Sequence, residues 1–196
     1  LPINARADGV FYADVFLGSS IGNNTKVVAE LTDLNGKKIG ASIEKVLQAG
    51  SDKVVLEQKF DNVKNWTAET PNLYYVNFSL VQDGKVLHKV KERIGFRTIE
   101  VKESDGIYIN GQKVNIRGVN RHSFRPETGR TLSRQANFDD VKLIKEMNMN
   151  AVRMSHYPPD PEFLEACDEL GLYVMNELGG WHGKYDTAVG TKLVHE

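Results

Sequence analysis

Three stretches with strand character are each followed by side chains that can bind a polar ligand. His122 comes just after the run IRGVN, His156 just after NAVRMS, and Glu177 ends the run LYVMNE. An imidazole has two ring nitrogens, each of which can donate or accept a hydrogen bond. Arg153 lies in the last half of NAVRMS, from where its side chain can reach the same end of the sheet. The sequence therefore predicts a polar site built from strand ends.

The elements that carry these residues alternate between strand and helix. Strands are predicted over residues 116–120, 150–155 and 172–177, and helices over 137–147 and 161–170. Short connections between such elements are typical of parallel βα units, whose helices lie on one side of the sheet. Three strands do not close a (β/α)₈ barrel, which takes roughly 250 residues. The first helix is expected to bury one apolar side, made of Phe138, Val141, Leu143, Ile144 and Met147.

The first hundred residues follow a different pattern, in which apolar and polar residues alternate in about seven short runs. Asn35-Gly36 and Asp83-Gly84 separate such runs and suit two-residue hairpins, in which both central residues have positive φ. Asn110-Gly111 has the same character. We therefore expect a multidomain chain of the β plus α/β class. An immunoglobulin-like antiparallel β-sandwich over residues 1–103 is followed by the first three βα units of a barrel over 104–196.

Composition excludes several classes of function. The formal net charge is −1 and the pI is near 6.6, so no basic surface for nucleic acid is expected. No apolar run is long enough to cross a membrane. Cys167 is the only cysteine, which excludes an intrachain disulfide and a multi-cysteine zinc site. Cys167 itself is expected to be a small buried apolar residue.

Several ordered motifs carry a resemblance to a known family. They are WTAETPNLYYVNFSL, IGFRTIEV, INGQKVNIRGVNRHSFRPETGR, NAVRMSHYP and CDELGLYVMNE, which together run from about Trp66 to Glu177. This sequence resembles the family 2 glycoside hydrolases, which include β-galactosidases, β-glucuronidases and β-mannosidases. The resemblance implies a sandwich that precedes a catalytic (β/α)₈ barrel, in agreement with the order of the predicted elements.

The resemblance also implies an activity and the position of its catalytic groups. It implies a retaining hydrolase of O-glycosidic bonds in β-linked sugars, most similar to β-galactosidases. The acid/base glutamate of the family lies near the end of the fourth barrel strand and the nucleophile near the seventh, so we expect this chain to be a fragment without catalytic residues. The Asn176-Glu177 pair matches the acidic end of the third strand, and Glu177 is therefore not expected to be the proton donor.

Individual residues receive roles from the same resemblance. His122 and His156 match histidines that contact sugar hydroxyls, and Arg153 matches an arginine that orients the nucleophile. An exposed tryptophan after the third strand, Trp181, suggests stacking on the substrate sugar. Asn120 and Arg121 are expected at or behind the pocket, or else they cap the strand and pair with Glu127 or Asp160. Pocket-lining or supporting positions are therefore Asn120, Arg121, Glu177 and His182.

Alternatives remain open at this level. No cofactor is expected, because the Glu-x-His pattern of magnesium-binding relatives is absent; a magnesium site with Glu177 and His182 is an alternative. The sandwich is alternatively a non-catalytic carbohydrate-binding or scaffolding module. A metal-dependent barrel hydrolase holding its ion with His122, His156 and Glu177 is a further alternative. The expected partner is a β-glycoside, with no nucleic acid and no membrane, and with a homo-oligomer allowed; the compartment is open between cytoplasm, periplasm and secretion.

Overall fold

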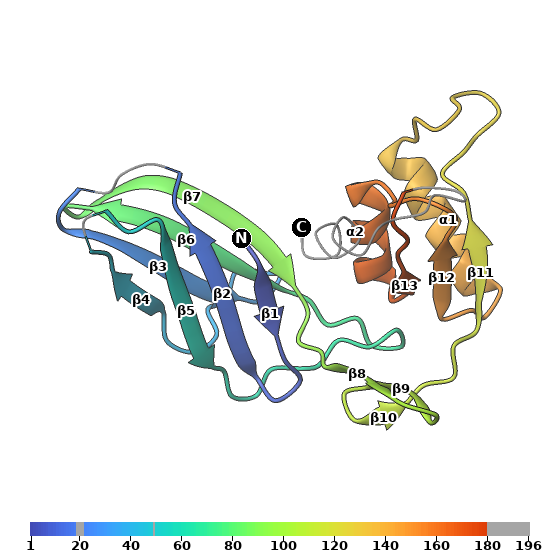
Figure 1. The fold of residues 1–196 in the computed structure, drawn as a ribbon, viewed down its shortest axis with the longest axis horizontal. Coiled ribbons are helices and arrows are strands. Elements are labelled where there is room, and N and C mark those ends of the chain that lie inside the picture. Colours follow the sequence, from blue (N-terminus) through green and yellow to red (C-terminus); the bar gives the residue numbers. More distant parts are fainter. Residues whose placement is uncertain (19–21, 49, 180–196) are drawn as a thin grey trace. The chain divides into compact units, whose positions relative to one another are not determined.

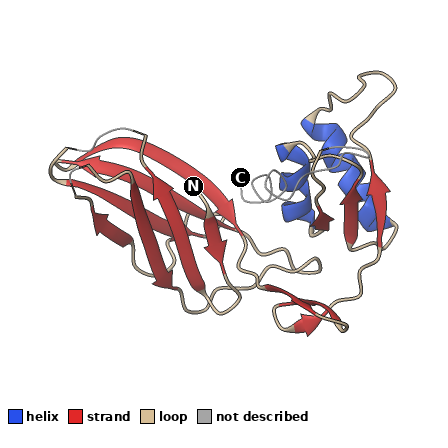
Figure 2. Ribbon diagram, in the orientation of Figure 1, coloured by secondary structure: helices blue, strands red, loops and turns tan. Residues whose placement is uncertain are grey.

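The structure is a computed structural model that describes residues 1–18, 22–48 and 50–179. The chain forms two compact units, Leu1–Val114 and Asn115–Glu196, and each is described by itself. Strands make up the first unit, and the helices of the described residues belong to the second (Figure 1, Figure 2). None of the described helices combines the length and apolar character that a membrane span requires.

The main part of the first unit is a pair of antiparallel sheets. The order of the smaller is β1-β2-β5, and that of the larger is β4-β3-β6-β7 (Figure 1). Seven strands in two antiparallel sheets confirm the predicted immunoglobulin-like sandwich. The bounds of its strands are β1 Ile3–Ala5, β2 Val10–Phe16, β3 Thr25–Thr32, β4 Ile43–Val46, β5 Lys53–Lys59, β6 Tyr74–Gln82 and β7 Lys85–Ile94.

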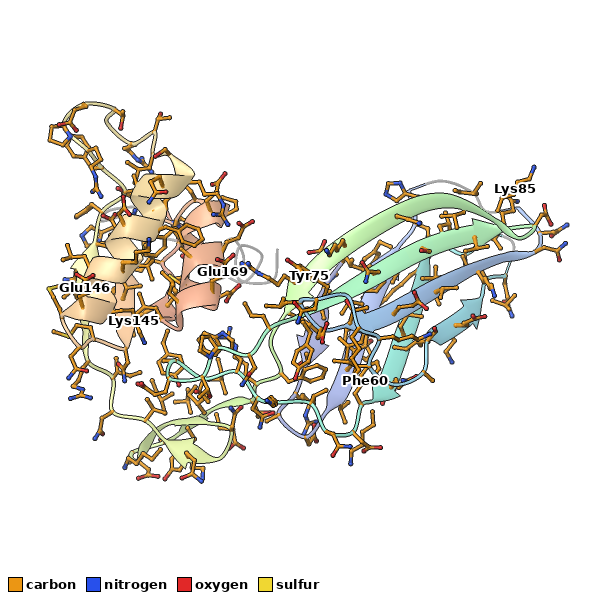
Figure 3. The ribbon with its side chains drawn as sticks, turned by 180° about the vertical axis from the view of Figure 1, so that it is seen from behind. Phe60, Tyr75, Lys85, Lys145, Glu146 and Glu169 are labelled. Atoms are coloured by element: carbon orange, nitrogen blue, oxygen red, sulfur yellow. The ribbon has the colours of Figure 1, made fainter. Side chains whose placement is uncertain are left out.

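The core of the sandwich follows from the alternation along its strands. In β3, buried and half-buried side chains alternate without interruption, as expected for a strand with one face toward a second sheet. Aromatic rings connect the sheets: Phe60 packs edge-to-face on Phe11 and Phe96, with ring centroids 6.1 and 6.3 Å apart. Phe60 is labelled in Figure 3. The first unit therefore has a hydrophobic core of its own.

The hairpin predictions were right at two sites and wrong at one. Asp83 and Gly84 both have positive φ and join Gln82 directly to Lys85, as a two-residue turn requires. At Asn35-Gly36 only Gly36 has positive φ. The Asp33 carboxylate there accepts hydrogen bonds from the backbone N–H of Asn35 and of Lys37, both at 2.9 Å. A longer turn thus replaces the expected two-residue turn, and Thr32 pairs with Lys38 as an antiparallel neighbour.

A small antiparallel sheet closes the first unit. It contains β8 (Ile99–Lys102), β9 (Gly106–Ile109) and β10 (Gln112–Lys113), and Asn110-Gly111 forms the predicted two-residue turn. The Asn110 amide donates to the Trp66 carbonyl at 3.1 Å and accepts from the Thr98 N–H at 2.9 Å. Contacts thus group this sheet with the sandwich, whereas the boundary proposed from sequence, after residue 103, assigns β9 and β10 to the barrel.

The second unit is the start of a parallel α/β fold. Its strands are β11 (Gly118–Arg121), β12 (Ala151–Met154) and β13 (Tyr173–Met175), paired in parallel in that order. Helices α1 (Arg134–Glu146) and α2 (Pro161–Leu170) cover one face of the sheet (Figure 1). The predicted βα order is confirmed. The buried core between sheet and helices consists of Val141, Ile144, Val152, Met154, Phe163, Ala166, Cys167 and Leu172.

The helix ends explain where the two helices begin and stop. Ser133 caps α1 by accepting the Ala136 N–H at 3.2 Å, so α1 begins three residues before the predicted start. Gly171 ends α2 with φ of 78°, as predicted. The expected apolar side of α1 is only partly right, because Leu143 and Met147 are exposed in this unit. Lys145 and Glu146 at the end of α1 are labelled in Figure 3.

Candidate functional site

The register of the parallel sheet brings polar side chains together. Asn120 of β11 lies opposite Arg153 of β12, and Arg153 lies opposite Met175 of β13. Paired residues of neighbouring strands point to the same face, and this row alternates with the row of Val119 and Val152, which packs toward the helices. Asn120 and Arg153 therefore lie on the face of the sheet that the helices leave uncovered.

A connected set of contacts extends from Arg153. Its Nε forms an ion pair with Oε1 of Glu177, and its Nη1 donates to Oδ1 of Asn120 at 3.4 Å. The second carboxylate oxygen of Glu177 lies 3.2 Å from Nδ1 of His156. Glu177 thus has one oxygen on the guanidinium and the other on the imidazole. All three side chains are partly exposed, so a ligand can reach them.

Two histidines and a tyrosine continue this cluster. The rings of His122 and His156 meet edge-to-face with centroids 5.6 Å apart, and His122 also lies 6.0 Å from the Tyr157 ring. The guanidinium of Arg130 stacks 3.8 Å from the centroid of Tyr157. Sequence reasoning did not select Tyr157 or Arg130. Tyr157 adjoins a selected histidine, but nothing in the local pattern of Arg130 indicates a contact 27 positions along the chain.

The structure places Arg121 apart from these residues. Arg121 is the last residue of β11 and pairs with Met154, so its side chain points toward the helices. Its partners are Asp140 and Asn137 of α1, in place of the Glu127 or Asp160 considered from sequence. The strand was predicted to end at Asn120, whereas β11 continues through Arg121 and its alternation turns Arg121 away from the cluster.

Cys167 has no part in this chemistry. It lies in α2 with 1% of its surface exposed, inside the core of the second unit. Burial raises the pKa of its thiol well above the ordinary range, with a smaller contribution from the charge of Asp168. A thiol that does not ionise is a poor nucleophile and a poor metal ligand. The prediction of a small buried apolar residue is confirmed.

The described residues offer no obvious metal centre. Within residues 1–18, 22–48 and 50–179, no group of three or more His, Cys, Asp or Glu side chains is arranged to hold an ion. His122, His156 and Glu177 are not arranged as such a group in this structure, and the metal-dependent alternative stays a prediction. Trp181 and His182 lie outside the described residues, so their predicted contacts and the magnesium alternative stay predictions.

The cluster occupies a defined place in the fold. His122 directly follows β11, and His156 and Glu177 each follow the end of their strand by two residues. The carboxyl ends of parallel strands carry the active sites of (β/α)₈ barrels, in the loops that follow them. Asn120, His122, Arg153, His156 and Glu177 are thus brought together as predicted, while their roles toward a ligand stay predictions.

Comparison with known proteins agrees with this architecture. The family model described as glycosyl hydrolases family 2 matches residues 3–97, and that of the TIM barrel domain of the same family matches residues 99–190. A β-galactosidase of Alteromonas mediterranea is 39% identical over 158 residues, which is 80% of this chain and 14% of that protein. The chain thus spans about a seventh of the length of this curated relative. It spans 20% and 17% of the length of two further curated relatives, one from Formosa agariphila and a β-galactosidase of Halalkalibacterium halodurans.

Solved structures of two proteins are similar in fold to this chain. A glycosyl hydrolase family 2 member from Bacteroides cellulosilyticus is 27% identical, with a TM-score of 0.81 over 93% of this chain and 24% of that one. An FMN-binding β-glucuronidase from Facaelibacterium prausnitzii L2-6 is 26% identical, with a TM-score of 0.75 over 90% of this chain and 27% of that one. Two family models that together span nearly the whole chain, and the fold that they imply, identify it as a member of glycosyl hydrolase family 2.

Proposed function

We propose that the protein to which these residues belong hydrolyses β-linked glycosides with retention of configuration, as a β-galactosidase-like enzyme. The observation that carries the proposal is the polar cluster of Asn120, His122, Arg153, His156 and Glu177 at the carboxyl ends of three parallel strands. Strand ends of this kind form the active face of a (β/α)₈ barrel. Membership of the glycosyl hydrolase family supports a sugar as the ligand at that face.

The side chains of the cluster divide into two roles. His122 and His156 are proposed to hydrogen-bond sugar hydroxyl groups, since each imidazole can donate from one nitrogen and accept at the other. Arg153 is proposed to orient a nucleophilic carboxylate, because a guanidinium favours the ionised form of a neighbouring acid. Glu177 already engages Arg153 and His156 with its two oxygens, which suits it to hold these side chains in place.

Catalysis requires groups beyond this cluster. A retaining hydrolase uses two carboxyl groups about 5 to 5.5 Å apart, one as acid and base and the other as nucleophile. Among the described residues, Glu177 is a carboxylate that contacts both Arg153 and His156, and its two oxygens are already engaged by them. We therefore propose that both catalytic carboxylates are supplied by other parts of the enzyme and that residues 1–196 alone have no turnover. Release of nitrophenol by the purified 196-residue chain would contradict this.

The test of the site uses the full-length protein and nitrophenyl β-galactoside, with the β-glucuronide and β-mannoside as alternative substrates. Replacing His156 by Ala should lower kcat/KM about 10- to 100-fold, since one or two hydrogen bonds to the sugar are lost. His88→Ala is the matched control, because His88 is exposed on β7 of the sandwich. Equal activity of both variants would exclude His156 from the site, and a faster reaction with the glucuronide would correct the sugar.

A further inference from the structure

Two buried residues bracket the exposed His122. Arg121 has 6% of its surface exposed and Ser123 has 4%. The hydroxyl of Ser123 accepts a hydrogen bond from Nη1 of Arg121 at 3.0 Å. The backbone on both sides of His122 is therefore held from the helix side of the sheet, while His122 itself lies against the His156 ring on the other side.

The other two nitrogens of the Arg121 guanidinium bond to helix α1. Its Nε donates to Oδ2 of Asp140 at 2.8 Å, and its Nη2 donates to Oδ1 of Asn137 at 2.9 Å. The plane of the group stacks 3.9 Å from the ring centroid of Phe163 in α2. A planar fork with three engaged nitrogens fixes both the position and the orientation of the side chain, which a lysine cannot reproduce.

The same network reaches the loop after His122 and the segment of His156. The other carboxylate oxygen of Asp140 pairs with Arg125, whose backbone bonds reciprocally with Gly129 at 2.8 and 2.9 Å. The carbonyl of Arg121 accepts the backbone N–H of Ser155, the residue before His156, at 3.0 Å. One residue thus ties together the two segments whose histidine rings stand 5.6 Å apart.

We propose that Arg121 and Asp140 form a positioning pair that sets the distance between His122 and His156 and so determines how tightly the sugar is bound. Neither residue touches the substrate in this proposal; both act through His122. The consequence for sugar binding rests on the proposed function, whereas the consequence for the ring geometry does not.

The kinetic test is a double-mutant cycle in the full-length protein. Arg121→Lys keeps the charge and loses the fork, and it should raise KM for the nitrophenyl glycoside about tenfold with a smaller change in kcat. In a His122→Ala background the same change should alter KM less than about twofold, because its effect passes through His122. Equal losses in both backgrounds, or no loss in either, would overturn the proposal.

A structural readout separates this inference from the proposed function. In the 196-residue chain, the nuclear Overhauser effect between the ring protons of His122 and His156 should weaken in Arg121→Lys and in Asp140→Asn. It should persist in Asp139→Asn, since Asp139 is an exposed neighbour on α1 that pairs with Gln135. If Arg121→Lys does not fold, Asp140→Asn gives the answer. An unchanged effect in both variants would refute the positioning role, whereas an inactive full-length protein would refute only the proposed activity.

Discussion

The sandwich and the barrel segment differ in what they bury. Apart from the aromatic Tyr74 and Trp66, the only polar side chain that the sandwich buries among the described residues is Thr25, whose hydroxyl donates to the Gly22 carbonyl at 2.8 Å. The barrel segment has fewer residues and buries four polar side chains, those of Arg121, Ser123, Asn137 and Ser155. The Arg121 guanidinium donates to Ser123 and Asn137, and the Arg121 carbonyl accepts the backbone N–H of Ser155. Buried polar groups cost free energy unless they are paired. The barrel segment buries such groups beside the strand ends that carry the candidate site.

The most buried charged pair of the described residues also lies in the barrel segment. Lys26–Glu44 and Lys38–Glu30 lie on the surface of the sandwich, with side chains about two-fifths to one-half exposed. Exposed pairs contribute little to stability because water and salt screen them. Arg121–Asp140 is 6% and 15% exposed. The comparison teaches that apolar packing determines the sandwich, whereas a directional polar network determines the face of the barrel segment.

The largest effect is expected where apolar packing alone holds the fold. Phe11 is buried between the sheets and packs on Phe60, so Phe11→Ala should reduce the free energy of unfolding of the sandwich by about 3–5 kcal/mol. Urea denaturation followed by residue-resolved amide signals measures the loss. The amides of β12 should keep their protection, because β12 belongs to the other compact unit.

Phe16 provides the matched control in the same strand. It is 60% exposed, so Phe16→Ala should change stability by less than about 0.5 kcal/mol. An equal loss of protection in both units after Phe11→Ala would mean that they unfold together, and the comparison between them would lose its basis.

Some parts of the fold were predictable because the pattern is local. The strands of the sandwich follow from period-two alternation, and the turn at Asp83-Gly84 follows from two residues that tolerate positive φ. Asn35-Gly36 failed because the preceding Asp33 carboxylate offers the backbone another set of hydrogen bonds. That competition is visible in the sequence once Asp33 is included in the turn.

The site was predictable only in part, because some of its contacts join residues that lie far apart in the sequence. His122, His156 and Glu177 follow strands, and a parallel sheet brings such positions together whatever their distance in sequence. Arg121 was harder, because its direction toward the helices follows only if the alternation of the strand continues one residue past the predicted end at Asn120. The stack of Arg130 on Tyr157 depends on the path of the loop, which has no periodic signal.

An intermediate effect is expected where two backbones of the barrel segment meet. A Cβ on Gly118 would lie 2.4 Å from the carbonyl oxygen of Ala151 in the paired strand. Backbone cannot rotate away as a side chain can, so Gly118→Ala should destabilise the barrel segment by about 1–3 kcal/mol. Thermal unfolding should detect this, and Gly179→Ala is the control, since a Cβ there meets nothing within 4 Å. A neutral Gly118→Ala would show that β11 and β12 can separate without loss.

The smallest effect is expected from a surface charge of the sandwich. Hydrogen bonds from Lys38 and, to a lesser extent, Ser42 lower the pKa of the Glu30 carboxyl. A lowered pKa in the folded state means that the stabilisation is present above the unfolded value, about 4.3, and is lost as the pH falls through the folded value. Because both side chains are nearly half exposed, the contribution should be only about 0.5 kcal/mol.

Comparing wild type with Glu30→Gln by urea denaturation at successive pH values measures this contribution. The stability difference should be constant above about pH 5 and should shrink below about pH 4, as wild-type Glu30 becomes protonated. Added salt should reduce the difference above about pH 5, where Glu30 is ionised, since the pair is exposed. A difference of several kcal/mol that resists salt would mean that a surface pair stabilises the sandwich as a buried pair does. The contrast between packing in the sandwich and polar bonding in the barrel segment would then be lost.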